Sequence, residues 1–144
     1  MKANEKDIFL LLTNKCSLRC FACGYGCENE KNNWFISKEQ FINALQKIKN
    51  TNLDGCTHYS VNLTGGDPML HKDWLEFAFI TKEILPESVC YISTSGPLLA
   101  TIEDEILIEC AKKHINFGIT LYPSMKLLPM YKKIEDKFLR LNMI

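Results

Sequence analysis

Four cysteines crowd into one short segment near the N-terminus and give the clearest chemical signal in the chain. Three of them form the motif Cys16-Ser-Leu-Arg-Cys20-Phe-Ala-Cys23, and Cys27 follows four residues later. Thiolates are soft ligands that suit iron–sulfur clusters and zinc. Three of them on one irregular loop can hold three corners of an iron–sulfur cubane, which leaves the fourth iron open to a small molecule.

Several alternatives stay open for these cysteines. A structural zinc site prefers four ligands in two separated knuckles, and we find no second knuckle in the sequence. Cys27 could be a fourth ligand, which would close the open iron, it could belong to another site, or it could be a bystander, which is the interpretation we favour. All four thiols could also be unliganded. The remaining cysteines, Cys56, Cys90 and Cys110, are scattered singly and are expected to be small buried hydrophobic side chains.

Polar and glycine-rich segments supply the other candidate site residues. Gly65 and Gly66 can let the backbone approach a ligand closely, and Asp67 offers an acceptor for a ligand ammonium group. Thr94 and Ser95 offer hydroxyl groups before a glycine turn. A plain turn or a polar loop would have the same residues, so only their position after predicted strands makes these segments candidates for a binding site.

The three histidines, His58, His71 and His114, form no spaced metal-ligand pair. We expect them to be surface or capping residues.

Apolar runs and helix signals place these segments on a common framework. Predicted strands cover residues 8–12, 58–64, 89–94 and 115–121, and each is followed by a predicted helix. The first helix starts at Ser37, where Gln40 completes a capping box, and the second covers 72–85. Thr101 is expected to cap the third helix, and Tyr131 belongs to the apolar stripe of the fourth.

A strand–helix order repeated four times predicts an α/β fold with a parallel sheet and right-handed crossovers. Ligands bind at the carboxyl ends of the strands in such folds. The cysteines follow the first strand, and Gly65-Gly66-Asp67-Pro68 follows the second. Ser95-Gly96-Pro97 and Tyr122-Pro123-Ser124 follow the third and fourth. All four irregular segments are therefore expected on one face of the sheet.

Length and composition set limits on the class of protein. A chain of 144 residues with 47% hydrophobic residues fits one ordinary domain, 1–144. Its formal net charge of zero gives no electrostatic indication of nucleic acid or a membrane surface. The longest apolar run is far too short to span a bilayer, and the N-terminus lacks a signal core. An odd number of cysteines argues against a secreted disulfide framework. We therefore expect a cytoplasmic protein.

The order and spacing of these motifs resemble the radical S-adenosylmethionine (SAM) superfamily. The Cys-x3-Cys-x2-Cys pattern straight after a first strand resembles the signature of that family. Residues 63–70, Leu-Thr-Gly-Gly-Asp-Pro-Met-Leu, are similar to its Gly-Gly-Glu motif with Asp in place of Glu. Residues 93–99 resemble its strand-three segment and 119–123 its strand-four end. The resemblance extends from about residue 8 to residue 122.

The resemblance implies two cofactors, a [4Fe–4S] cluster on Cys16, Cys20 and Cys23 and a SAM molecule on the open iron. The reduced cluster would cleave SAM into methionine and a 5′-deoxyadenosyl radical, which abstracts hydrogen from a substrate. By position, SAM-binding residues would be Gly65, Gly66 and Asp67 at the amino group, with Thr94 and Ser95 near the methionine or ribose part. An electron donor such as flavodoxin or ferredoxin is implied as well. The substrate, a small molecule or a peptide, and the catalytic residues are not identified.

Three departures from the family pattern carry consequences. The residue before the third cysteine is usually aromatic and contacts adenine, whereas here it is Ala22, with Phe21 and Tyr25 nearby. Asp67 is one methylene shorter than Glu. The chain has about four β/α units, whereas the family has a partial barrel of six.

The fold class expected is thus a partial parallel (β/α) barrel of the radical-SAM type, truncated at its C-terminus or completed by an oligomer or partner that covers the open sheet edge. Two alternatives to an enzyme remain. One is a non-catalytic iron–sulfur or zinc protein for binding or electron transfer, and the other is an inactive remnant.

Overall fold

Four strands and four α-helices alternate along the chain. The computed structural model describes residues 5–21, 23–27, 31–51 and 58–143. In chain order the elements are β1 (Glu5–Thr13), α1 (Lys38–Asn50), β2 (His58–Gly65), the 3-10 turn η1 (Pro68–Leu70), α2 (Trp74–Ile84), β3 (Val89–Thr94), α3 (Asp104–Lys112), β4 (Ile115–Ile119) and α4 (Leu128–Arg140). The predicted strand–helix order is confirmed.

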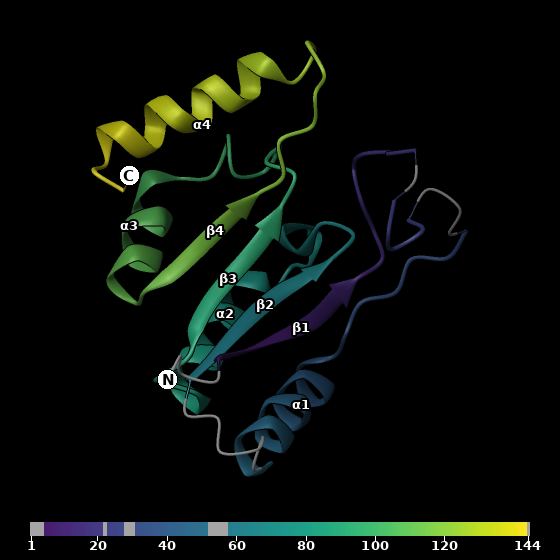
Figure 1. Cartoon of the computed structure of the whole chain (residues 1–144), viewed down its shortest axis with the longest axis vertical. Helices are drawn as coiled ribbons and strands as arrows, with labels where there is room; N and C mark the ends of the chain where they lie inside the picture. The colour runs from purple at the N-terminus through teal and green to yellow at the C-terminus, as the bar shows by residue number, and fades with distance from the viewer. Residues whose placement is uncertain (1–4, 22, 28–30, 52–57, 144) are drawn as a thin grey trace.

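The strands form one open parallel sheet in the order β1-β2-β3-β4 (Figure 1). Each strand pairs with its neighbour in sequence, so every connection is a β/α crossover. The predicted α/β fold with a parallel sheet is therefore confirmed. Within the described residues β4 pairs only with β3, so its outer edge carries no strand.

The core lies on the side of the sheet that the helices cover. Alternate strand residues such as Leu12, Leu63 and Ile92 are buried there against helix residues. Phe41 of α1 and Phe77 of α2 stack with ring centroids 4.3 Å apart. The opposite face is more open, as the exposed large apolar side chains of β1 on that side show. Only one face of this sheet is therefore packed by helices.

Two of the scattered cysteines belong to this core. Cys90 and Cys110 are fully buried, as the sequence predicted, and burial raises the pKa of each thiol to about 12. Cys56 lies outside the described residues.

Of the two predicted helix caps, one is confirmed and one is wrong. The capping box of α1 is confirmed, since Ser37 Oγ accepts from the Gln40 amide and Gln40 Oε1 accepts from the Ser37 amide. The predicted cap of the third helix at Thr101 is wrong, because α3 begins at Asp104 with Glu103 at the N-cap. The Thr101 hydroxyl instead donates to the Leu98 carbonyl at 3.0 Å, within the turn that precedes the helix.

The ends of two predicted elements also shift. Residues 68–70 form η1, so α2 begins at Trp74, two residues after the predicted start. The fourth strand ends at Ile119 and not at residue 121.

The histidines differ from one another in their surroundings. His71 is buried, contrary to a surface position, and its Nδ1 accepts from the Asp73 amide at the start of α2. Its Nε2 lies 2.9 Å from the Ile36 carbonyl oxygen. His114 is exposed at a left-handed φ of 55°. The side chain of His58 lies outside what the structure describes.

Helix α4 is fixed to α3 by charged groups. Arg140 Nη1 lies 2.5 Å from Asp104 Oδ2, and Lys137 Nζ lies 3.8 Å from Asp104 Oδ1. Lys137 also donates to the Ile102 carbonyl. None of these helices, in the part of the chain that the structure describes, is long and apolar enough to cross a membrane.

Replacing Asp104 with Asn should weaken folding in a pH-dependent way. The hydrogen bond from Arg140 holds the pKa of Asp104 below its ordinary value of 3.8, so the charged carboxylate stabilises the fold at neutral pH. That contribution is lost as the pH falls below this value and Asp104 protonates. Urea unfolding midpoints of wild type and Asp104→Asn should therefore differ at pH 7 and converge below pH 3.8. A difference that does not change with pH would contradict the role of the charge.

Candidate functional site

The segments singled out in the sequence meet at one edge of the sheet. All four strands point the same way, and the loop after β1 rises from this edge (Figure 1). The cysteines lie on that loop, while Gly65, Asp67 and Thr94 stand at or just beyond the ends of β2 and β3. Direct contacts between these segments, described next, give the edge a defined geometry.

Gly65 and Gly66 make room for the backbone that leads into the cysteine loop. The Gly66 amide donates to the Thr13 carbonyl at 2.7 Å, and the Asp67 amide donates to the Lys15 carbonyl at 2.8 Å. A Cβ on Gly65 would lie 2.1 Å from the Thr13 oxygen, and one on Gly66 would lie 2.1 Å from the Lys15 oxygen. Gly65 also has a φ of +128°, which side-chain-bearing residues rarely adopt. The space expected for a ligand is thus taken, at these two Cα atoms, by the protein's own chain.

Asp67 ties the end of β2 to the end of β3. Its side chain is buried and accepts hydrogen bonds from three donors in the described structure: Thr94 Oγ1 at 3.0 Å to each oxygen, Ser95 Oγ at 2.9 Å and the Met69 amide at 3.2 Å. The predicted residues Asp67, Thr94 and Ser95 are therefore brought together. All three donors are neutral, so they orient the carboxylate without cancelling its charge.

The base of the cysteine loop is held by two buried polar residues that the sequence analysis did not select. Thr13 Oγ1 donates to the Trp34 carbonyl at 2.6 Å and accepts from the Lys15 amide at 3.0 Å. Asn14 Nδ2 donates to the Asn32 carbonyl at 2.9 Å, and Asn14 Oδ1 accepts from the Trp34 backbone amide at 2.8 Å. These bonds join the two ends of the loop, which fixes where the cysteines leave the sheet. The sequence signal that could have identified them is their position as two polar residues at the end of a buried apolar strand.

The three motif cysteines share one half-buried neighbourhood. Cys16 interacts electrostatically with Cys20, Cys23 and Asp67, and its sulfur accepts a hydrogen bond from the Leu18 amide at 3.4 Å. Burial is the main reason why the pKa of the Cys16 thiol is raised; the hydrogen bond from Leu18 opposes this, and the nearby Asp67, Cys20 and Cys23 raise the pKa further. The predicted ligand set is thus placed together at the mouth of β1.

Cys27 lies beside the motif rather than apart from it. Its thiol is hydrogen-bonded to Cys23 and interacts with Cys16. Burial, followed by this hydrogen bond, raises the pKa of Cys27 to about 11. This proximity leaves both interpretations open, bystander and fourth ligand.

No three His, Cys, Asp or Glu side chains among the described residues are placed so that they could hold a metal ion together. In a cubane each cysteine binds a different iron, so its ligands need not approach one another as the ligands of a single zinc ion do.

Tyr122 enters the site from the end of β4 and was not selected as a site residue from the sequence. Its side chain interacts with Cys20 and, more weakly, with Cys16 and Cys23. Burial and the contact with Cys20 raise the pKa of Tyr122 to about 12. The signal available in the sequence was its place directly after the fourth predicted strand.

The aromatic residues near the third cysteine take different positions. Tyr25 Oη lies 3.2 Å from Thr64 Oγ1 near the end of β2, so Tyr25 reaches toward the sheet. Phe21 is fully exposed to solvent. Ala22, the residue at the usual aromatic position, lies outside the described residues.

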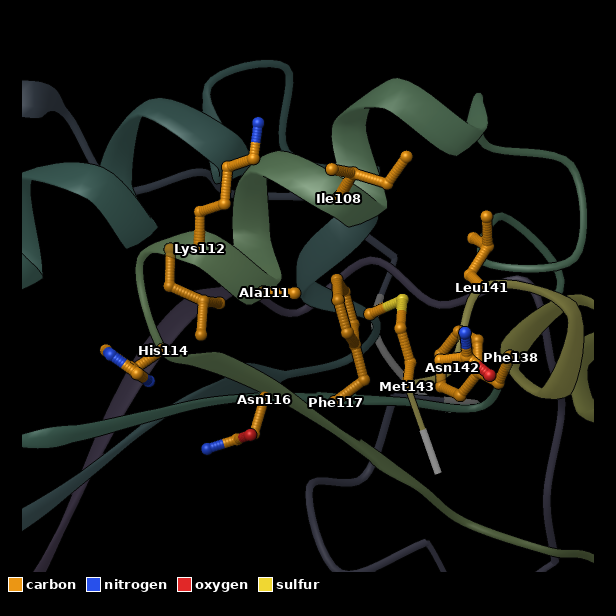
Figure 2. Close-up of a pocket in the computed structure, with 11 residues that line it drawn as sticks. Ile108, Ala111, Lys112, His114, Asn116, Phe117, Phe138, Leu141, Asn142 and Met143 are labelled. Atoms are coloured by element: carbon orange, nitrogen blue, oxygen red, sulfur yellow. The ribbon is translucent and has the colours of Figure 1, made fainter.

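One hollow of about 380 Å³ is remote from these groups. It lies between α3, the start of β4 and the end of α4, and Figure 2 shows Phe117, Phe138 and Met143 together with His114 around it. Its strand residues belong to the amino end of β4, whereas Tyr122 follows the carboxyl end. We therefore assign the functional site to the strand ends and not to this hollow.

Replacing Gly66 with Ala should displace the start of the cysteine loop. The new Cβ would meet the backbone of Lys15, which cannot move aside as a flexible side chain could, so we expect a loss of about 1–3 kcal/mol or more in unfolding free energy. Gly24→Ala in the same loop is the matched control, because a Cβ there meets no atom of the described residues within 4 Å. Urea denaturation checks both variants, and equal stability of the two would contradict the close approach.

Three comparisons relate the chain to known proteins. The family model described as "Radical SAM superfamily" matches residues 10–140. A probable GTP 3′,8-cyclase of Saccharolobus islandicus (strain Y.N.15.51 / Yellowstone #2) is 33% identical over 94 residues, which make up 65% of this chain and 28% of that protein. A protein of the same name from Methanocaldococcus jannaschii is 29% identical over 135 residues, 90% of this chain and 40% of that protein.

Among solved structures, methylornithine synthase (PylB) matches with a TM-score of 0.56 and 16% sequence identity, over 92% of this chain and 42% of that one. At this identity the likeness is one of fold. The chain spans less than half the length of each of these three proteins.

Proposed function

Because the chain belongs to the radical SAM superfamily, we propose that Cys16, Cys20 and Cys23 hold a [4Fe–4S] cluster and that the protein cleaves SAM reductively. The observation that carries this proposal is the meeting of the three thiols at the carboxyl edge of the sheet, on a loop fixed by Gly66, Thr13 and Asn14. When bound, the cluster would supply one electron to the sulfonium of SAM, which separates into methionine and a 5′-deoxyadenosyl radical.

The residues present suit such a cluster. The donor set consists of three soft thiols on one irregular loop, which is what iron–sulfur clusters require. Each thiol must lose its proton to bind iron, so cluster assembly releases protons. Binding to iron would stabilise the thiolate of Cys16 and so offset the burial that raises its pKa. The fourth iron would stay available to SAM as long as Cys27 does not bind it.

Asp67 would attract the amino group of SAM. The carboxylate is 1% exposed, and in the described structure its hydrogen-bond donors are neutral hydroxyl and amide groups. A buried charge without a compensating cation is costly, so a ligand ammonium group near Asp67 would be stabilised. Gly65 and Gly66 would border the same group with their backbone, and Thr94 and Ser95 would lie nearer the methionine or ribose part. Asp67 thus has two tasks, to join the strand ends and to present a negative charge.

The relatives do not agree on a substrate. Their names refer to GTP 3′,8-cyclase and to methylornithine synthase, which act on different molecules. Similarity to both supports the shared SAM-cleaving core and no particular substrate, and we propose that the hydrogen donor is a small molecule or a peptide. An electron donor of the flavodoxin or ferredoxin kind would reduce the cluster.

A further strand would complete the sheet next to β4. The outer edge of β4 has no partner among the described residues, and a groove of about 500 Å³ beside it is lined by apolar residues including Leu121 and Leu128. Unpaired strand edges attract other strands. We propose that a further β/α unit, from the same or another chain, covers this edge and adds to the substrate pocket.

A non-catalytic iron–sulfur protein is the second candidate function. The contact between Cys27 and Cys23 favours it, because a fourth thiolate on the open iron would exclude SAM. The protein would then transfer electrons or serve a structural role.

Anaerobic reconstitution tests the first proposal. Wild-type protein should bind about four irons and four sulfides per chain, as a cubane requires, and form 5′-deoxyadenosine from SAM after reduction. Cys20→Ala should lose most of the bound iron and all of the cleavage, because only two motif thiols remain. Cys110→Ala removes a thiol buried in the core away from the loop and is the matched control. Unchanged iron content in Cys20→Ala would sink the proposal.

Cys27→Ala separates the two candidate functions. If Cys27 is a bystander, this variant should keep both the iron content and the SAM cleavage of the wild type. Loss of iron, or cleavage that appears only after the substitution, would identify Cys27 as a fourth ligand and favour the non-catalytic protein. Iron analysis and chromatography of the cleavage products give both readouts.

A further inference from the structure

His71 lies buried between the segment that returns from the cysteine loop and the start of α2. It is 3% exposed, although histidine is more often partly exposed in proteins. Its ring lies 5.6 Å from the ring of Phe35 and 4.8 Å from that of Phe77, measured between centroids. One side chain therefore contacts both the chain that enters α1 and a residue in the body of α2.

Each ring nitrogen of His71 has its own hydrogen-bond partner. Nδ1 lies 3.1 Å from the Asp73 amide, which can only donate, and Nε2 lies 2.9 Å from the Ile36 carbonyl oxygen, which can only accept. The neutral imidazole that makes both bonds therefore carries its proton on Nε2. Nδ1 thus orders the chain at the start of α2, while Nε2 binds the segment that returns from the loop.

The returning segment is held on its other side by β1. It runs beside the end of that strand (Figure 1), where Phe35 pairs with Thr13 in an antiparallel bridge. The Ile36 amide donates to the Leu12 carbonyl at 2.9 Å, while the Ile36 carbonyl accepts from His71. Ile36 is therefore bonded to β1 through its amide and to His71 through its carbonyl, which ties the end of the cysteine loop to the start of α2.

We propose that His71 is a positioning residue for the cluster-binding loop, which it holds through the hydrogen bond from Nε2 to the Ile36 carbonyl. Gly66 fixes the end of the loop that leaves β1, and His71 fixes the end that returns to α1. A loop with both ends fixed loses less conformational freedom when its three thiols bind, so cluster binding is stronger. The inference rests on the proposed function, since it assumes that this loop holds a cluster.

The helices on either side of His71 have contacts of their own. Phe41 of α1 stacks on Phe77 of α2 at 4.3 Å between centroids, and Lys38 Nζ lies 2.5 Å from Glu76 Oε1. A groove of about 550 Å³ separates the returning segment from the start of α2, and His71 is among the residues that line it. Loss of the Nε2 bond should therefore release the returning segment without separating the two helices.

Two amide side chains divide the two tasks of the ring. His71→Gln places an amide nitrogen near the position of Nε2, from which it can donate to the Ile36 carbonyl. His71→Asn places an amide oxygen near the position of Nδ1, from which it can accept from the Asp73 amide, but it is too short to reach Ile36. Lys38→Met breaks the exposed ion pair between the two helices instead and is the matched control.

The first measurement is hydrogen exchange of the cysteine-loop amides in the cluster-free protein, followed by mass spectrometry. The second is the rate at which reconstituted protein loses iron to a chelator. We expect His71→Asn to exchange its loop amides faster and to lose iron about 2- to 10-fold faster than wild type, which corresponds to one hydrogen bond. His71→Gln and Lys38→Met should match the wild type in both measurements.

Wild-type behaviour of His71→Asn in either measurement overturns the inference and leaves the proposed function intact. So does an equal effect of His71→Gln and His71→Asn, since the ring would then act through its packing alone. If His71→Asn does not fold, His71→Phe takes its place, because it keeps the ring but donates nothing to Ile36. A wild-type protein that takes up no cluster overturns the proposed function, and the exchange measurement still decides whether His71 holds the loop.

Discussion

The close approach of two backbone segments determines the geometry of the whole site. The chain leaving β1 passes over Gly65 and Gly66 so closely that no side chain fits between them. Two backbone hydrogen bonds, to Thr13 and Lys15, hold this contact. The first cysteine follows Lys15 directly, so the position of the thiols is inherited from the end of β2. The first role of the two glycines is therefore to position the cysteine loop, and contact with a ligand is secondary.

Further contacts join the ends of the other strands to this point. Asp67 follows the glycines and binds Thr94 and Ser95, so the end of β3 is joined to the same point. Tyr122 approaches from β4 and meets the cysteine loop from the far side. The site is thus a ring of contacts between consecutive strand ends, in which each strand contributes one polar or small residue. Such a ring holds the thiols in place while the other face of the sheet stays open.

Sequence reasoning succeeded where a rule is local. The strand at 89–94 and the capping box of Ser37 and Gln40 depend on neighbouring residues alone, and the structure has both as predicted. It failed where a tertiary contact competes. Thr101 has the side chain of a cap, but a turn before α3 takes its hydroxyl. Tyr131 fits the apolar stripe of its helix, yet its hydroxyl binds the backbone after β4. The contact of Tyr122 with Cys20 spans 102 positions of sequence, and no pattern within one segment can reveal it.

The order of the strands has a consequence for how the protein is made. Among the described strands, β2, β3 and β4 each pair with the strand synthesised just before them, so none of these pairings waits for a distant part of the chain. A chain emerging from the ribosome can therefore build its sheet one strand at a time, since folding units generally form as they are synthesised. The cysteine loop gains its anchor as soon as β2 has emerged, and β4 emerges after the other three described strands with the residue that faces the thiols. The thiols would then be held in place before the strand that faces them has emerged.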